Sequence, residues 1–565
     1  MTTAGPAGSP AADAPVEGHG GDLALAVARA HGITTLWTLS GAHVFPLYDA
    51  AAREGTPTPT RNVDVRHEQS AVFAAEATAK LTRSPGLAVL TAGPGVTNGI
   101  SAVAQASYSG VPLLALGGRA PAYRWGTGSL QELDHPPLLA PVTKYAATAR
   151  KVTELPGVVD EALRIATTPH RGPVFVDVPM DELFSRVSVE LPPPPPRRRP
   201  LEPDPDDLAE IAEVVADAER PVLVLGSDVW ADGAEGAAVR LAEETRLPVV
   251  TNGMGRGLLP PGHPLLVTRA RSTALGRADV VVVVGTPLDF RLGYGVFGGK
   301  DGAPPARVVH LADSPSQVSS HVTLAAAAAG DLTLVLDGVL SAWTDQLRRP
   351  DWSSWKETLR DAVAAAVDRD SALLSADAHP LHPARVYGEL LPLLGDDAVV
   401  IGDGGDFVSW AGKLVEPARP GGWLDPGPYG CLGAGVGAAA AARVARPASQ
   451  VVLLLGDGAA GMSLMDVDTL VRHRLPVVMV VGNNGAWGLE KHPMRMLYGY
   501  DVAADLRAET RYDGVVQALG GAGETVSRPD ELGPALRRAF ESGVPYLVNV
   551  LTDPAVAYPR STTGV

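Results

Sequence analysis

Short apolar runs alternate with longer amphipathic segments along most of the 565-residue chain. Uninterrupted apolar runs of strand length are typical of parallel strands that are buried on both faces. Because parallel strands are joined by crossover connections, usually helices, the alternation predicts an α/β fold built from doubly wound parallel sheets. In the first part of the chain we predict helices at residues 23–31 and 70–83, and strands at 35–39, 63–65, 86–91, 112–117 and 173–178.

The same alternation occurs three times, which predicts three domains. A chain of this length is also too long for one hydrophobic core. Predicted strands at 221–226, 248–251, 279–285 and 307–311 form the second group, and strands at 398–402, 451–455, 477–481 and 546–550 form the third. A Pro/Arg-rich linker at 192–200 and a charged helix at 352–375 separate the groups. We therefore expect a disordered tail at 1–19, domains at 20–190, 203–345 and 380–555, and a C-terminal tail at 556–565.

Two polar clusters follow neighbouring apolar runs in the third group. Gly456-Asp457-Gly458 follows the first run, and Asn483-Asn484 follows the second. Open α/β sheets bind ligands at the carboxyl ends of their strands. Carboxylate, amide and main-chain carbonyl oxygens are hard donors that suit Mg²⁺, whose other positions a diphosphate and water fill. Glycine at 458 lets the backbone approach the phosphates, so the sequence predicts a site for a Mg²⁺-bound diphosphate.

Composition and charge exclude several classes of function. Apolar residues make up 45% and charged residues 19% of the chain, which is typical of a globular protein. The net charge of −16 argues against a nucleic acid partner. No segment has the length and apolarity of a membrane span, so we expect no membrane association. The single cysteine, Cys431, suits a reducing compartment, and we expect a cytoplasmic location.

These motifs resemble those of the thiamine-diphosphate enzymes, and they occur in that family's order over nearly the whole chain. Glu68, within Arg66-His67-Glu68-Gln69, matches the acid that protonates the pyrimidine ring of the cofactor. Leu432 matches the apolar wedge that bends the cofactor, and the carbonyl of Gly430 matches the acceptor for the pyrimidine amine. The resemblance implies that the three domains bind the pyrimidine, a nucleotide and the diphosphate, in that order.

The resemblance also assigns ligands. It implies that Mg²⁺ is bound by Asp457, Asn484 and the main-chain carbonyl of Ala486. It implies that the cofactor contacts Glu68, Gly404, Asp406, Gly430, Leu432, Gly458, Ala459 and Asn484. In the family the pyrimidine and diphosphate domains of different subunits meet, so we expect a homodimer at minimum and a homotetramer built from such dimers.

Four residues are candidates for catalysis: Glu68, Gln131, His43 and Glu490. His43 lies in a loop that faces the cofactor in the family, although a purely structural histidine is an equally open interpretation. Gln131 lies in Ser129-Leu130-Gln131-Glu132, which resembles a family segment written Phe-Gln-Glu. Glu490 follows the metal-binding motif, where it acts either on a substrate hydroxyl or only as a solvated helix residue.

The central domain resembles that of oxalyl-CoA decarboxylases and 2-hydroxyacyl-CoA lyases, where it holds the ADP part of coenzyme A. In this interpretation Arg269 or Arg271 meets a phosphate, because the guanidinium fork suits such groups. Arg560 in the tail is a further candidate for a contact with coenzyme A, with a frayed terminus as the alternative. The same glycine and arginine patterns also fit FAD, which acetolactate synthases bind there, so the sequence leaves ADP, coenzyme A and FAD open.

We therefore predict a 2-hydroxyacyl-CoA lyase that converts a small-molecule acyl-CoA to formyl-CoA and an aldehyde or ketone. Leu130 stands where relatives commonly have Phe, which opens space for a branched acyl group. Acetolactate synthase is the alternative, although that enzyme carries a substrate-facing Trp where this chain has Pro493. A benzaldehyde-lyase-like carboligase is a third hypothesis, based on Gly41-Ala42-His43 and on residues 419–424.

Overall fold

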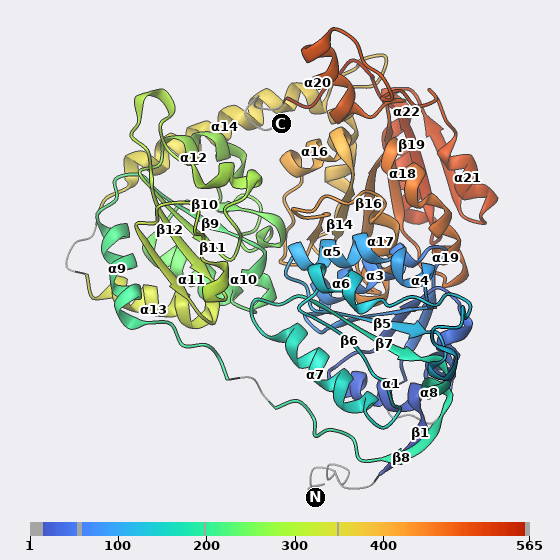
Figure 1. The fold of residues 1–565 in the computed structure, drawn as a ribbon. Coiled ribbons are helices and arrows are strands. Elements are labelled where there is room, and N and C mark those ends of the chain that lie inside the picture. The colour runs from blue at the N-terminus through green and yellow to red at the C-terminus, as the bar shows by residue number, and fades with distance from the viewer. Residues whose placement is uncertain (1–14, 54–58, 197–198, 347–349, 560–565) are drawn as a thin grey trace, which may run out of the picture. The chain divides into compact units, whose positions relative to one another are not determined.

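The computed structural model describes the chain except for residues 1–14, 54–58, 197–198, 347–349 and 560–565 (Figure 1). The described residues form two compact units. Those of the first unit fall within 1–75, 84–107 and 111–198, and those of the second within 76–83, 108–110 and 199–565. The first unit contains one large parallel sheet and the second contains two. The prediction of three α/β domains with parallel sheets is therefore confirmed.

The first sheet has six parallel strands in the order β3-β2-β4-β5-β7-β6. Its strands are β2 (Thr35–Thr38), β3 (Arg61–Asp64), β4 (Gly86–Leu90), β5 (Leu113–Arg119), β6 (Tyr145–Thr148) and β7 (Pro173–Pro179). The α-helices are α1 (Gly20–Ala30), α2 (Phe45–Ala52), α3 (Glu68–Thr82), α4 (Pro94–Thr97), α5 (Ile100–Tyr108), α6 (Pro136–Leu139), α7 (Leu155–Thr167) and α8 (Met180–Phe184). Every residue of β4, β5 and β7 is buried, as expected for central strands covered on both faces.

The second sheet has five parallel strands in the order β10-β9-β11-β12-β13. Its strands are β9 (Pro221–Leu225), β10 (Val249–Thr251), β11 (Val280–Val284), β12 (Arg307–Ala312) and β13 (Ala326–Ala329). The α-helices are α9 (Pro205–Ala216), α10 (Ser227–Ala231), α11 (Glu235–Thr245), α12 (Arg271–Arg277) and α13 (Leu332–Thr344). The predicted connecting helix is α14 (Ser353–Leu374).

The third sheet has six parallel strands in the order β15-β14-β16-β17-β19-β18. Its strands are β14 (Val399–Asp403), β15 (Trp423–Leu424), β16 (Val451–Gly456), β17 (Val478–Asn483), β18 (Ala522–Val526) and β19 (Tyr546–Leu551). The α-helices are α15 (Pro383–Leu390), α16 (Gly405–Leu414), α17 (Gly435–Ala445), α18 (Asp457–Ser463), α19 (Val467–Arg472), α20 (Gly488–Tyr498), α21 (Tyr512–Ala518) and α22 (Pro529–Glu541).

The structure differs from the sequence prediction mainly at sheet edges. The strands that were not predicted in the three large sheets are β6, β13, β15 and β18, and each lies at the edge of its sheet. β6, β13 and β18 are partly exposed, so they need no continuous apolar run. β15 is buried but has only two residues, which are too few to form a recognisable run.

The N-terminal tail also requires a correction. Residues Val16–His19, which we expected to be disordered, form β1, and β1 pairs antiparallel with β8 (Arg186–Val189). His19 then caps α1, because its side chain accepts a hydrogen bond from the amide of Asp22. Residues 1–14 of the predicted tail lie outside the described residues. Among the described residues, no helix is both long and apolar enough to cross a membrane.

The strand order explains where ligands are expected. In the third sheet β15 lies on one side of β14 and β16 on the other, so the winding direction reverses between β14 and β16. In the first sheet the same reversal occurs between β2 and β4. Such switch points leave a crevice outside the carboxyl ends of the two strands, and ligands of open α/β sheets bind there. Both crevices contain residues that the sequence analysis selected.

Candidate active site

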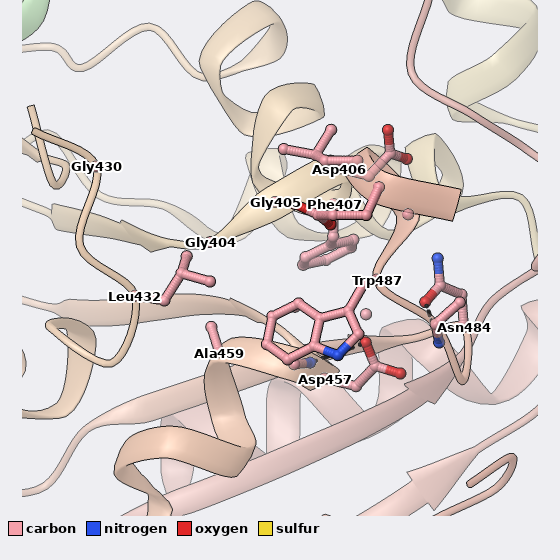
Figure 2. A pocket seen from close by; sticks show the side chains of 17 residues that line it. Gly404, Gly405, Asp406, Phe407, Gly430, Leu432, Asp457, Ala459, Asn484 and Trp487 are labelled. Carbon is pink, nitrogen blue, oxygen red and sulfur yellow. Dashed lines mark hydrogen bonds between the residues drawn. The ribbon is translucent and has the colours of Figure 1, made fainter. Parts of the chain in front are cut away.

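A pocket of about 200 Å³ lies at the switch point of the third sheet (Figure 2). The turns that follow β14, β16 and β17 line it. Every residue of this unit that we predicted to contact the metal or the cofactor lines this pocket: Gly404, Asp406, Gly430, Leu432, Asp457, Gly458, Ala459, Asn484 and Ala486. The structure therefore brings together residues that are more than 80 positions apart in the sequence.

Asp457 lies at the start of α18 and is 3% exposed. Its Oδ1 accepts a hydrogen bond from the amide of Gly458 at 3.0 Å, and its Oδ2 accepts one from the amide of Gly485 at 2.7 Å. Burial raises the pKa of Asp457 to about 6, although these amide donors act in the opposite direction. A buried carboxylate of this kind is stabilised in its charged form by a bound cation.

Asn484 follows β17 directly, as the sequence predicted. Gly456 and Gly482 are partners in the pairing of β16 with β17, so the residues that follow both strands lie at the same edge of the sheet. The side-chain Oδ1 of Asn484 accepts a hydrogen bond from the amide of Ala486 at 3.1 Å. A turn is thereby formed that holds the predicted amide and carbonyl ligands close to Asp457.

Two glycines allow neighbouring side chains to lie close to the main chain in the pocket. A Cβ atom on Gly458 would lie 2.4 Å from the ring of Trp487, which is shorter than any real contact of this kind. Gly404 has φ +91°, and a Cβ atom there would lie 2.7 Å from the Cβ of Ala459. The sequence analysis did not select Trp487. Its position directly after the metal-binding turn was the only signal for it.

Leu432 lies beside Gly404 and Ala459, on the opposite side of the pocket from Asp457 and Asn484 (Figure 2). This separation matches a cofactor whose diphosphate binds at the metal ligands while its rings lie near the apolar side chain. Asn484 and Asp457 offer oxygen donors at one end, and the leucine offers apolar surface at the other. The residues present therefore fit thiamine diphosphate.

Asp403 holds the loop that carries Leu432, and the sequence analysis missed it. Asp403 is the last residue of β14 and is fully buried. Its Oδ1 accepts a hydrogen bond from the amide of Gly433 at 3.1 Å, and its Oδ2 accepts one from the amide of Gly435 at 2.7 Å. Both carboxylate oxygens thus bind main-chain donors just after Leu432. The available signal for this role was its position at the end of a buried strand, two residues before the glycine that begins α16.

In the first unit, Glu68 is the first residue of α3 and is 8% exposed. The side chain of Asn98 donates a hydrogen bond from Nδ2 to Oε2 of Glu68 at 3.0 Å. Asn98 ends the turn that begins at Gly93, so this turn fixes one oxygen of the carboxylate. No role was predicted for Asn98 from the sequence.

His43 lies at the switch point of the first sheet, in the short helix Ala42–Val44. Its Nδ1 lies 3.2 Å from Oγ1 of Thr91, which follows β4. Burial lowers the pKa of His43 below its ordinary value of 6.5, while a hydrogen bond with the main chain of Leu130 raises it by a smaller amount. The imidazole is therefore neutral at neutral pH.

Leu130 and Gln131 lie in the loop that contacts this histidine. The side chain of Leu130 is 79% exposed. Gln131 has φ +61°, and a Cβ atom built on Gly93 would lie 2.9 Å from its Cβ. The predicted residues His43, Leu130 and Gln131 are thus gathered around the Gly93 turn, whose other end contacts Glu68.

Glu490 lines the pocket of the third sheet from the first turn of α20, and its side chain is exposed. Pro493 lies inside the same helix. The structure therefore places Glu490 at the mouth of the pocket, where its role as an acid or base stays a prediction.

The two arginines of the second sheet's domain have different partners. Arg269 donates from Nη2 to Asp370 at 2.6 Å, and Lys413 donates to the other oxygen of Asp370 at 2.5 Å. Arg271 donates to the main-chain carbonyl of Arg291 at 2.7 Å. Burial lowers the pKa of Arg271 to about 10, and the positive charges of Arg256 and Arg291 act in the same direction. Arg256, Arg271 and Arg291 thus form a cluster of cations. Its charge is partly balanced, because Arg291 is paired with Asp289 and the carboxylates of Asp425 and Glu416 act on Arg256.

The C-terminal segment reaches the pocket wall. The amide of Tyr558 donates to Oδ1 of Asp406 at 2.9 Å, and its ring packs edge-on against Trp410. Arg560, the predicted coenzyme A contact, lies outside the described residues.

The fold and the two clusters define an enzyme of three α/β domains that holds a diphosphate cofactor by its third domain. Comparison with known families agrees with this class. Residues 18–138 match the N-terminal TPP binding domain of thiamine pyrophosphate enzymes, residues 208–339 match their central domain, and residues 403–550 match their C-terminal TPP binding domain. The chain belongs to the thiamine pyrophosphate enzyme family.

Relatives of this chain include proteins named acetolactate synthase and proteins named 2-hydroxyacyl-CoA lyase. "Acetolactate synthase large subunit IlvG" of Mycobacterium tuberculosis is 52% identical over 546 residues, which cover 96% of this chain and 97% of the relative. "2-hydroxyacyl-CoA lyase 2" of Mus musculus is 36% identical over 580 residues, which cover 94% of this chain and 90% of the relative. The protein of that name from Homo sapiens is 34% identical, with 94% and 90% covered. The chain is thus a thiamine-diphosphate enzyme that is similar both to acetolactate synthases and to 2-hydroxyacyl-CoA lyases.

Proposed function

We propose that this enzyme is a 2-hydroxyacyl-CoA lyase that uses thiamine diphosphate and Mg²⁺. The overall reaction converts a 2-hydroxyacyl-CoA to formyl-CoA and an aldehyde or ketone, so all atoms of the substrate appear in the two products. The observation that carries the proposal is the position of the buried imidazole of His43, next to the loop that carries the exposed, non-aromatic side chain of Leu130. Burial lowers the pKa of His43, which favours its neutral form. A neutral imidazole can accept the proton of a substrate hydroxyl, and a leucine leaves space beside the carbon that bears it.

Asp457, Asn484 and the carbonyl of Ala486 would hold Mg²⁺ in this enzyme. The raised pKa of Asp457, to about 6, supports this assignment because a buried carboxylate without a cation is unfavourable in its charged form. Leu432 would hold the thiazolium and pyrimidine rings in their bent arrangement. When bound, the cofactor supplies a nucleophilic thiazolium carbon and an electron sink. Glu68 would exchange a proton with the pyrimidine, and Asn98 keeps its carboxylate in place.

The loop that carries Leu130 supports the proposal that the substrate has a branched acyl group. Leu130 exposes most of its side chain, and its main chain contacts His43. A ketone-forming substrate carries two carbon substituents on its hydroxyl-bearing carbon, so it needs more space there than a linear substrate. His43 and Glu490 are the two candidates for the group that accepts the hydroxyl proton.

The cation cluster around Arg271 supports a phosphate-bearing group in the central domain. Arg269 is already paired with Asp370, so Arg271 is the better candidate of the two predicted arginines. ADP, coenzyme A and FAD all carry phosphates that would suit this cluster. In the proposed function the group is the ADP part of coenzyme A.

Acetolactate synthase is the second candidate function. The observation that favours it is the 52% identity to relatives that carry this name. Pro493 inside α20 stands against it, because the family enzyme has a substrate-facing tryptophan at this place. FAD would then occupy the central domain, and pyruvate would be the substrate.

One assay separates these functions. Purified protein with thiamine diphosphate and Mg²⁺ is offered 2-hydroxyisobutyryl-CoA, mandelyl-CoA, pyruvate or benzoin in separate reactions. The proposal expects formyl-CoA with a ketone or aldehyde from the acyl-CoA substrates, and no yellow flavin in the purified protein. Acetolactate from pyruvate, with bound flavin, would replace the proposal by the second candidate. Benzaldehyde from benzoin alone would favour the carboligase hypothesis.

Assembly and location stay predictions. The family resemblance supports a homodimer at minimum and a homotetramer built from two dimers. A chain with one cysteine cannot form an intrachain disulfide, and proteins of reducing compartments rarely contain disulfides. The single cysteine therefore supports a cytoplasmic location.

A further inference from the structure

His135 forms a buried chain of hydrogen bonds at the carboxyl edge of the first sheet. The side chains of His135 and Asp177 are both fully buried. Nδ1 of His135 lies 2.8 Å from Oδ2 of Asp177, and the amide of Gly93 donates to Nε2 of His135 at 2.9 Å. Arg119 donates to the same Oδ2 of Asp177 at 3.0 Å, so two side chains hold this oxygen. The sequence analysis selected none of these three side chains.

The two hydrogen bonds fix the tautomer of His135. The main-chain N–H of Gly93 can only donate a hydrogen bond, so Nε2 of His135 must accept it and carries no proton. The proton of the neutral ring is then on Nδ1, where it is donated to Asp177. The ring thus links the side chain of Asp177, a buried residue of β7, to the main chain of Gly93.

The loop that receives this hydrogen bond leads directly to Glu68. Gly93 has φ +57°, and its carbonyl accepts from the amides of Val96 and Thr97 at 3.1 and 3.0 Å. The amide of Asn98 donates to the carbonyl of Pro94 at 2.9 Å. Residues 93–98 therefore form one tight turn, anchored by His135 at its first residue. At its last residue, Asn98 donates to Glu68.

We propose that His135 is a positioning residue: by accepting the hydrogen bond from the amide of Gly93 it sets the Gly93–Asn98 turn, and through Asn98 it fixes the carboxylate of Glu68. The inference rests on the proposed role of Glu68 as the group that exchanges a proton with the cofactor. The side chain of His135 is fully buried, so we assign it no contact with the cofactor or the substrate. It acts by keeping the carboxylate of Glu68 in one orientation, because a small displacement of a reacting group slows proton transfer strongly.

Two substitutions of His135 separate this role from ordinary core packing. The side-chain amide of Gln reaches the position of Nε2, so His135→Gln keeps an acceptor for Gly93 and loses the bond to Asp177. The side-chain amide of Asn reaches only the position of Nδ1, so His135→Asn keeps the bond to Asp177 and loses the acceptor for Gly93. The two variants have the same functional group and similar polarity. Asn is smaller than His, so a packing role predicts damage with Asn whether or not Asn98 is present. The proposed role predicts that the damage from Asn depends on Asn98, and that Gln, which keeps the acceptor for Gly93, causes little.

The first measurement uses the protein without cofactor. Amide hydrogen exchange of a peptide covering residues 92–98 should be about tenfold faster in His135→Asn than in the parent, because one hydrogen bond to the turn is lost. His135→Gln should leave this exchange near the parent rate. Equal exchange in Asn and Gln variants would overturn the proposal.

The second measurement uses bound thiamine diphosphate without any acyl substrate. Deuterium exchange at the reactive thiazolium carbon should be about tenfold to hundredfold slower in His135→Asn and close to the parent rate in His135→Gln. The decisive comparison is between Asn98→Ala alone and the double variant that also carries His135→Asn. If His135 acts through Asn98, His135→Asn should slow the exchange little further in the Asn98→Ala background. A full additional slowing would overturn the proposed route.

A matched control is available in the same unit. His31 and Asp160 form a similar, partly buried pair, with Nε2 of His31 2.7 Å from Oδ1 of Asp160. His31→Asn should leave the deuterium exchange at the cofactor unchanged. Glu68→Gln distinguishes the possible failures: if it does not slow the exchange, the assignment of Glu68 is wrong. If it slows the exchange while His135→Asn does not, only the role of His135 is wrong.

Discussion

Buried carboxylates define the site at the scale of single residues. Asp403 and Asp457 are both buried at the end of a strand, and burial raises the pKa of each to about 6. Both accept hydrogen bonds from main-chain amides, which partly offset the cost of burying the charge. Asp457 in addition faces the predicted metal position, whereas Asp403 only holds the loop of Leu432. Burial of the charged Asp403 carboxylate therefore lowers the stability of the folded protein, and no predicted ligand offsets this effect.

The stability of the cofactor-free protein should depend on the ionisation of Asp403. Its folded-state pKa of about 6 lies above its ordinary value of 3.8, so the folded protein binds the proton more tightly than the unfolded chain does. The contribution is fully present below about pH 4 and is lost as the pH rises through 6, by up to about 3 kcal/mol. Asp403→Asn, which cannot ionise, should lack this part of the decline. Urea unfolding of both proteins from pH 4 to 7 measures it, and parallel pH profiles would contradict the assignment.

Leu130→Phe should narrow the substrate range. The larger ring would fill space beside the hydroxyl-bearing carbon, and a difference of one or two carbons in such a pocket is worth about 1–3 kcal/mol. Activity on a branched 2-hydroxyacyl-CoA should therefore fall about tenfold or more relative to activity on a linear one. Comparison of kcat/KM for the two substrates tests this. Equal losses on both would show that Leu130 does not face the acyl group.

At the scale of elements, the site consists of strand ends and the helices that begin there. β14 leads into α16, β16 leads into α18, and each transition contains glycine where the main chain comes close to a neighbour. Because the helices start at the edge of the sheet, their first amides are directed at the pocket. The same arrangement in the first sheet gathers His43, the Gly93 turn and Glu68.

Gly458→Ala should impair binding of cofactor and metal. Its new Cβ would overlap the ring of Trp487, which must move away from the metal-binding turn. Overpacking of this kind costs about 1–3 kcal/mol, so cofactor affinity in calorimetry should fall about tenfold or more. Gly461→Ala in the same helix is the matched control, because a Cβ there meets no atom within 4 Å. It should keep the affinity and stabilise α18 by about 0.5–1 kcal/mol. Equal affinity in both variants would show that the approach of Trp487 is not required.

At the scale of the whole molecule, Glu68 and the metal ligands belong to different compact units of the chain. The family resemblance implies that Glu68 of one subunit and Asp457 of another serve the same site. A homodimer would then have two equivalent sites, each made from both chains. This assembly is a prediction that hybrid proteins can test.

Mixing two inactive variants should restore activity. Glu68→Gln and Asp457→Ala each remove one required group from both sites of a homodimer. A hybrid dimer has one site with both defects and one intact site, so a statistical mixture should regain about one quarter of the parent activity. Refolding or co-expression of the two variants, with deuterium exchange at the bound cofactor as the readout, measures this. No recovery in verified hybrids would place both groups of a site on one chain.

The apolar runs by themselves determined the strands and the parallel sheets, because a strand buried on both faces must be apolar along its length. The same runs located Asp457 and Asn484 at strand ends, and the motifs around them and Glu68 indicated the cofactor. The edge strands β6, β13, β15 and β18 and the N-terminal strand β1 were not predicted, because their pairing depends on partners far away in the sequence.

Only the tertiary structure decided which polar residues support the site. Asp403 holds the loop of Leu432, and His135 binds the turn of Gly93 across 42 positions of sequence. Their residue types are common, and the only local signal was the place of Asp403 at the end of a buried strand. Their roles arise from burial and from the direction of main-chain amides, which exist only after the strands are brought side by side. Local sequence thus determined the chemistry of the site, and the packing of distant segments determined its geometry.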